Sequence, residues 1–158
     1  METNLSANDP QGAVRFFEDK VRYSTGPVEL EHALAHGRRI GTDFNLIDVR
    51  GPAEFAKGHI PGAENLPEGY WSTLAGLGHD RLNIIYGESP VSHVAARAAL
   101  EFATAGFSVM ELDGGFLAWE EHGFQIERES SKTKDSGRLR SESSNEPNEG
   151  RFLNESIL

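Results

Sequence analysis

The sequence of 158 residues contains no cysteine. A chain without thiols forms no disulfide bonds, offers no thiolate ligand to a metal ion and carries no Cys-X-X-Cys redox pair. Because disulfide usage is the usual guide to an oxidising or reducing compartment, this composition is neutral about compartment. The only sulfur atoms are the thioethers of two methionines, which do not store transferable sulfur.

Positive charge is also scarce. The formal net charge is −10, with 15 lysine and arginine residues against 25 aspartate and glutamate residues. The acidic excess lies in residues 1–127, which hold 9 basic and 19 acidic residues, whereas residues 128–158 hold six of each. Nucleic acids and anionic membranes are recognised by basic surfaces. We therefore expect no nucleic acid and no membrane as a partner.

Long hydrophobic runs are missing as well. No stretch reaches the roughly 20 apolar residues that span a bilayer. The first residues, Met1-Glu2-Thr3-Asn4, lack the basic and apolar regions of a leader segment. These features predict a cytoplasmic protein.

The sequence does contain a series of short apolar runs. They predict buried strands because they are too short for helices and are bounded by turn residues; the runs cover residues 46–49, 63–66, 83–86 and 108–112. Helical patterns cover residues 10–23, 28–36 and 94–105. The first of these helices begins with Asp9 as the cap and Pro10 at the first helical position.

This alternation predicts an α/β fold, an open parallel sheet with helices on both faces in three layers. Residues 87–93 lie between a strand and a helix, which places them at the carboxyl edge of the sheet, where ligands usually bind. We expect a helical extension packed on the domain over residues 1–24 and the domain itself over residues 25–127. The Ser-rich segment 128–158 is predicted to be a flexible or disordered tail.

Several motifs occur in a fixed order along the predicted domain. They are Leu46-Ile47-Asp48-Val49-Arg50, Gly58-His59-Ile60-Pro61-Gly62-Ala63, Asn65-Leu66-Pro67 and Asp113-Gly114-Gly115. Together they resemble the rhodanese-like superfamily. The resemblance implies the α/β fold above and a catalytic cysteine directly after the fourth core strand, which holds sulfur as a persulfide among backbone amides. At the matching position this chain has Gly87.

The candidate site is the loop that follows this strand. Its residues are Gly87, Glu88, Ser89, Pro90, Val91, Ser92 and His93. Glycine cannot form a sulfur–sulfur bond, and the carboxylate of Glu88 disfavours an anion in the loop. We therefore expect no catalytic residue.

Other polar residues of the motifs are interpreted as structural. Asp48, Arg50 and His59 are expected to support the loop, with the buried Asp48 bound by the following amides or by Arg50. Ser92 and Asp113 are expected to cap the helices that follow them.

Two functions from different classes remain open. The first is a non-catalytic rhodanese-like domain that binds a protein partner. The alternative is a thiosulfate or persulfide sulfurtransferase whose catalytic cysteine is replaced at position 87 or supplied by a partner. His93 acting on Ser89 or Ser92 would make a hydrolase, which requires a geometry that the sequence does not supply. No cofactor is expected, and no metal site, because the histidines are scattered and only His32 and His36 lie four residues apart on one helix.

Overall fold

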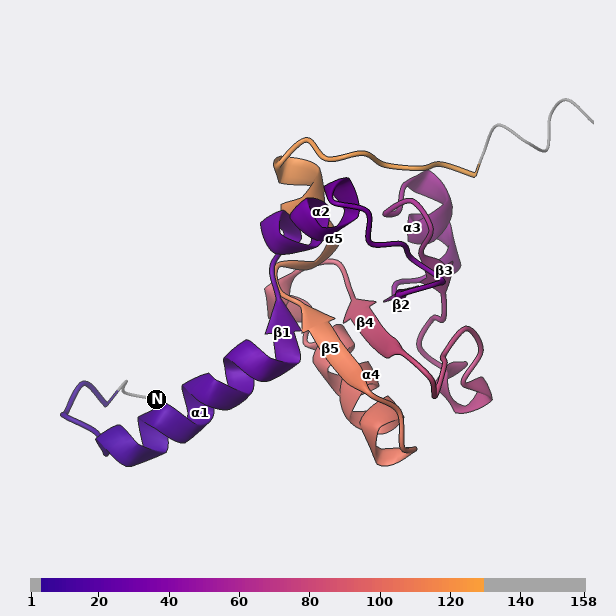
Figure 1. Cartoon of the computed structure of the whole chain (residues 1–158). Coiled ribbons are helices and arrows are strands. Elements are labelled where there is room, and N and C mark those ends of the chain that lie inside the picture. Colours follow the sequence, from indigo (N-terminus) through magenta and orange to yellow (C-terminus); the bar gives the residue numbers. More distant parts are fainter. Residues whose placement is uncertain (1–3, 130–158) are drawn as a thin grey trace, which may run out of the picture. The chain divides into compact units, whose positions relative to one another are not determined.

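The strands form one five-stranded sheet in the computed structural model, which describes residues 4–129 (Figure 1). Its order is β1-β5-β4-β2-β3 and every pairing is parallel. The bounds are β1 Ser24–Thr25, β2 Phe44–Asp48, β3 Glu64–Asn65, β4 Leu82–Tyr86 and β5 Val109–Leu112. The predicted open parallel sheet is confirmed.

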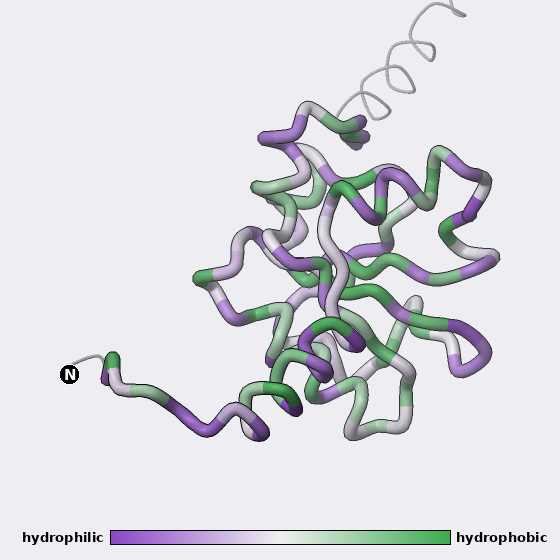
Figure 2. Tube along the Cα trace, turned by 60° about the vertical axis from the view of Figure 1, so that its left-hand side comes forward, coloured by the Kyte–Doolittle hydropathy of each residue, from purple (hydrophilic) through white to green (hydrophobic). Residues whose placement is uncertain are grey.

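Side chains of the central strands alternate between two apolar clusters. Leu46 and Ile84 belong to one cluster, whereas Ile47 and Ile85 belong to the other. Successive side chains of a strand point to opposite faces of its sheet, so both faces of β2 and β4 are covered. Figure 2 shows hydrophobic and hydrophilic segments alternating along the trace of the described chain.

Helices cover both faces, which confirms the three-layer arrangement. Leu30 of α2 (Pro27–Ala35), Phe55 of α3 (Pro52–Lys57) and Trp119 of α5 (Gly115–Glu121) join the first cluster. The second cluster contains Phe102 of α4 (Val94–Thr104) and Trp71 of a short 3₁₀ helix, η1 (Trp71–Thr73). Phe102, Phe107, Phe116 and Trp119 are all buried.

The N-terminal helix begins as the sequence predicted but does not pack as expected. In α1 (Pro10–Tyr23) the Asp9 carboxylate accepts hydrogen bonds from the amides of Gln11 and Gly12 at 3.1 and 2.9 Å. No residue of α1 is buried, and Phe17 keeps 58% of its surface exposed. The predicted helical extension is present, but none of its residues is buried against the domain.

Two predicted helix caps are also wrong. His93, in the left-handed conformation with φ 55°, precedes α4, and the Ser92 hydroxyl donates to the Ser89 carbonyl at 3.0 Å. Gly114, with φ 85°, precedes α5, and the Asp113 carboxylate lies 3.5 Å from the ammonium of Lys20. In both places the chain turns too sharply before the helix for the side chain to reach the first free amides.

Within residues 4–129, no helix combines the length and the apolar content that crossing a bilayer requires. The strand β1, which pairs with β5 through Ser24 and Thr25, has no counterpart among the predicted strands. Most of the predicted tail, residues 128–158, lies outside the described part of the chain. The predicted domain boundaries therefore stay predictions.

Candidate functional site

The candidate site lies where β2 and β4 end side by side. Asp48 and Tyr86 are paired in register at the carboxyl ends of these strands. Because the strands are parallel, the segments that follow them, Arg50-Gly51 and Gly87-Glu88, meet at one edge of the sheet. The predicted position of the 87–93 loop follows from this pairing.

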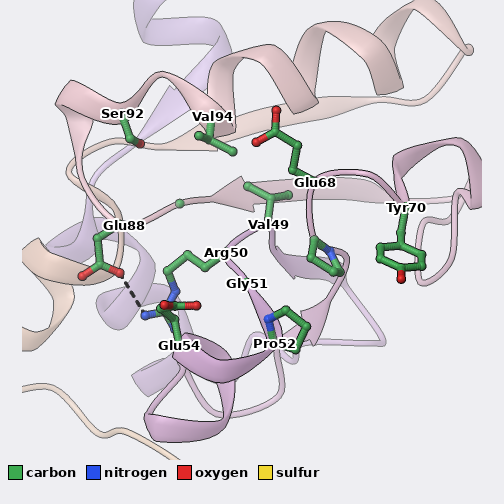
Figure 3. Close-up of a pocket in the computed structure, with 12 residues that line it drawn as sticks. Val49, Arg50, Gly51, Pro52, Glu54, Glu68, Tyr70, Glu88, Ser92 and Val94 are labelled. Atoms are coloured by element: carbon green, nitrogen blue, oxygen red, sulfur yellow. Dashed lines mark hydrogen bonds and ion pairs between the residues drawn. The ribbon is translucent and has the colours of Figure 1, made fainter.

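A cavity of about 520 Å³ opens at this edge and is called the edge pocket below (Figure 3). Its lining comes from the segments after β2, β3 and β4 and from the start of α4. The residues are Val49, Arg50, Gly51, Pro52, Glu54, Pro67, Glu68, Tyr70, Gly87, Glu88, Ser92 and Val94.

Arg50 is the only basic residue of the lining, and its guanidinium is almost fully engaged. Its Nε and Nη2 donate to the Asp48 carboxylate at 2.8 to 3.1 Å. Nη2 also donates to the Gly58 carbonyl at 2.5 Å, and Nη1 donates to Glu88 at 3.1 Å. A guanidinium has five N–H groups, so a single Nη1 hydrogen remains for anything that enters the pocket.

The charges around Arg50 hold it in its ionised form. Burial opposes the charge, but the hydrogen bonds and charge of Asp48 and the hydrogen bond to Glu88 outweigh it, and the pKa of Arg50 is raised. Burial, followed by the charge of Asp48, raises the pKa of Tyr86. Arg50 also lies over the ring of Phe116, with its Cζ 4.0 Å from the ring centroid. This arginine therefore crosslinks the edge of the sheet and is not free to act as an anion receptor.

Gly87 forms the part of the pocket where the family resemblance places a cysteine. A Cβ atom added there would lie 3.6 Å from the amide nitrogen and Cβ of Ala95 and 3.7 Å from the Ser92 hydroxyl. These are ordinary van der Waals distances, so the backbone has room for a side chain that the sequence does not provide.

The loop is held from behind by α5. The Phe116 amide donates to the Gly87 carbonyl at 2.8 Å, and the Leu117 amide donates to the Glu88 carbonyl at 2.9 Å. Gly115 permits this approach, because its φ is +63° and a Cβ atom there would lie 2.6 Å from the Gly87 carbonyl oxygen. The Asp113-Gly114-Gly115 motif thus contributes to the site because Gly115 lets the start of α5 approach the Gly87 and Glu88 carbonyls closely.

Only part of the predicted loop faces the pocket. Gly87, Glu88 and Ser92 line it, whereas Ser89, Pro90, Val91 and His93 do not. Val91 lies in a 3₁₀ turn, η2 (Pro90–Ser92), with 85% of its surface exposed.

The three residues predicted to support the loop lie in different places. Asp48 is fully buried beneath Arg50 and accepts from its amide at 2.9 Å, which is the contact expected for it. His59 is buried outside the pocket lining and stacks on Phe55 with ring centroids 3.7 Å apart. Its backbone pairs with that of Glu127, so His59 joins the end of the domain to the segment after α3.

Sequence reasoning missed the opposite wall of the pocket. Glu68 and Tyr70 follow β3, which pairs with β2, and Glu54 lies in the first turn of α3. In a parallel sheet, the segments that follow neighbouring strands meet at the carboxyl edge. Because this also holds for the segment after β3, the same reasoning would have placed these residues near the 87–93 loop. The strand order, which makes β3 a neighbour of β2, was the missing information.

Comparisons with known proteins agree with this geometry. A family model described as Rhodanese-like domain matches residues 27–122. The probable adenylyltransferase/sulfurtransferase MoeZ of Mycobacterium tuberculosis is 38% identical over 97 residues, which cover 59% of this chain and 23% of that protein. A sulfurtransferase of Allochromatium vinosum is 38% identical over 85 residues, which cover 53% of this chain and 78% of that protein.

A solved structure is similar over most of the described chain. The crystal structure of a protein from Bacillus halodurans has a TM-score of 0.67 and 28% sequence identity, and the match covers 77% of this chain and 88% of that one. The chain spans less than a quarter of the length of MoeZ. The similarity therefore concerns this domain alone and not the activity of the whole of MoeZ. The family model, the sequence relatives and the fold agree, and this chain belongs to the rhodanese-like domain family.

Proposed function

We propose that this chain acts as a non-catalytic rhodanese-like domain that binds a protein partner through the edge pocket. The observation that carries the proposal is Gly87, which occupies the nucleophile position of a pocket that is otherwise formed. No cysteine occurs anywhere in the 158 residues, so the chain has no thiolate on which a persulfide forms.

The hydroxyl groups of the loop do not replace the thiol. The Ser92 hydroxyl donates to the Ser89 carbonyl, and no hydrogen bond joins either serine to His93 within the described residues. A serine nucleophile needs a base in hydrogen-bond contact. The geometry therefore gives no support to a hydrolase.

The enzymatic part of the proposal is tested by thiocyanate formation from thiosulfate and cyanide. We expect the wild-type chain to give the rate of a protein-free control, while a cysteine-containing rhodanese assayed in parallel gives turnover. Turnover by the wild-type chain would contradict the proposal.

The binding part is tested by quantitative affinity capture with paired variants. Gly87→Leu adds a bulky side chain at a residue that lines the edge pocket without changing charge, and Glu121→Gln changes an exposed residue of α5 as a control. Recovery of a pocket partner should fall with the first variant and stay unchanged with the second. If recovery of every captured protein is independent of position 87, the pocket is not the binding surface.

The second candidate is a sulfurtransferase that works with a thiol supplied by a partner. The room above Gly87 for at least one further atom is the observation that favours it. This candidate predicts thiocyanate formation once the captured partner is added to the wild-type chain, and loss of that activity in the Gly87→Leu variant.

A further inference from the structure

The charges of the edge pocket are opposite to those that an anion requires. Three exposed carboxylates line it, from Glu54, Glu68 and Glu88, against the single guanidinium of Arg50. That guanidinium already has a buried counterion in Asp48 at 2.8 Å. Arg50 also pairs with Glu88 at 3.1 Å. One guanidinium against Asp48 and the three glutamates still leaves a formal charge of −3 on this group of residues.

Arg97, which pairs with one of these glutamates, reduces the negative potential only in part. Arg97 pairs with Glu68 at 2.9 Å, but both side chains are more than half exposed. Exposed pairs contribute about 0–1 kcal/mol and exchange readily with other partners. Arg97 does not line the pocket. A cation inside the pocket can therefore pair with Glu68 from a different side than Arg97.

The walls between the carboxylates are apolar. Val49, Pro52, Pro67 and Val94 contribute to the lining, and the ring of Tyr70, with 62% of its surface exposed, stands at the mouth (Figure 3). A lysine or arginine side chain has an apolar stem and a charged head, so it fits apolar walls with acidic groups at the rim. An exposed aromatic ring adds a cation–π contact.

A bare metal ion matches this site poorly. Its three carboxylates come from three separate segments around a cavity of about 520 Å³. Within residues 4–129, no group of three or more acidic or histidine side chains is close enough to hold a metal ion. The apolar walls would also have no role with an ion.

From these observations we infer that the edge pocket receives a lysine or arginine side chain presented by a partner protein. This inference rests on the proposed function and names the chemistry of the partner. The exposed ring of Tyr70, which is part of the lining, provides an apolar contact for the surface around the inserted side chain.

The test is a titration of the isotope-labelled full chain, followed by NMR. The probe is the capped peptide Gly-Ser-Lys-Ser-Gly, and the control peptide carries norleucine, which keeps the stem and lacks the charge. We expect saturable shifts at the amides of Gly51, Glu88 and Val94 with the lysine peptide and at least about tenfold weaker binding of the norleucine peptide.

Two sets of variants separate the pocket from the overall negative charge. The pocket variant combines Glu54→Gln, Glu68→Gln and Glu88→Gln. The control variant combines Glu18→Gln, Glu101→Gln and Glu121→Gln, three exposed residues outside the pocket. Both variants change the net charge by the same amount, so the inference predicts at least about fivefold weaker binding for the pocket variant and less than about twofold for the control.

Gly87→Leu is the second test, because it blocks the pocket without removing charge and does not depend on how the triple variant folds. It should abolish the shifts. Equal weakening in both triple variants, or unchanged binding in Gly87→Leu, would overturn the inference. So would saturable thiosulfate shifts at the same three amides with similar affinity.

Failure of the inference and failure of the proposed function give different results. If the wild-type chain forms thiocyanate, the non-catalytic proposal fails whatever the peptide does. If the chain is inactive and the lysine peptide does not bind, the proposal stands and the inference fails.

Discussion

Restoring the missing thiol tests both the space at Gly87 and the influence of Glu88. In Gly87→Cys the new Cβ atom lies 3.6 Å from its nearest neighbours, so the fold should accept it with a change in unfolding free energy below about 1 kcal/mol. The thiol then lies beside a carboxylate that is 53% exposed. We expect the single variant to be folded but a poor sulfurtransferase.

The size of the Glu88 effect follows from its exposure and its ion pair. Two unit charges 4 Å apart interact by about 1 kcal/mol in water and about 4 kcal/mol near a protein surface. Because Glu88 is half exposed and lies 3.1 Å from Arg50, the lower figure is appropriate. Thiosulfate carries two charges, so Glu88 costs about 2 kcal/mol in its capture, which is about 30-fold in kcat/KM.

The informative comparison is Gly87→Cys alone against Gly87→Cys with Glu88→Gln. Glutamine keeps an acceptor for Arg50 while removing the charge, so the double variant should exceed the single one by about 30-fold in kcat/KM for thiosulfate. The pKa of the thiol, measured from the pH dependence of iodoacetamide alkylation, should fall by about 0.7. Glu121→Gln in the same background is the control and should change neither value.

One result would refute this reasoning. If Gly87→Cys alone equals the double variant in kcat/KM, then Glu88 does not govern anion entry, and the electrostatic account of the edge pocket is wrong.

Three further predictions concern the stability of the fold. Gly115→Ala should lower the free energy of unfolding, measured by urea denaturation, by at least about 2 kcal/mol more than Gly123→Ala. Both glycines have positive φ, but only Gly115 lies against the loop carbonyls. Equal losses would show that this close approach is unimportant. Burial, followed by the charge of Asp113, raises the pKa of Glu111. The folded state therefore favours the protonated carboxyl, and the stability that this adds at low pH is lost as the pH rises through the folded pKa. Glu111→Gln should therefore be more stable than wild type at pH 8 and equal to it at acidic pH, and a difference that grows on acidification would contradict the assignment. Phe17→Gln on exposed α1 should change the thermal midpoint little, with less than about 0.5 kcal/mol in stability; a large loss would mean that α1 is packed in solution.

Local chemistry accounts for the elements that the sequence predicted well. Asp9 and Pro10 define the start of α1 because capping involves only neighbouring residues. The strands β2 and β4 were predictable because a strand covered on both faces reads as an unbroken apolar run. The two-residue strand β1 is too short for such a signal.

The chemical identity of the site was also contained in the sequence. Position 87 follows β4 directly, and a glycine there carries no thiol whatever the surrounding geometry. The partnership of Asp48 and Arg50 was predictable as well, since two residues separated by one position at the end of a buried strand have few other partners.

Tertiary structure alone decided what surrounds that position. The sequence placed Glu54, Glu68 and Glu88 far apart along the chain, and only the order of β3, β2 and β4 brings them around one cavity. It also decided that Gly115, and not the carboxylate of Asp113, serves the loop, because the contact depends on how closely α5 approaches the Gly87 carbonyl. The sequence by itself determines which chemical groups the chain carries and which hydrogen bonds form between near neighbours. The net charge of a pocket comes from several distant segments, and these segments meet only when the whole sheet has packed.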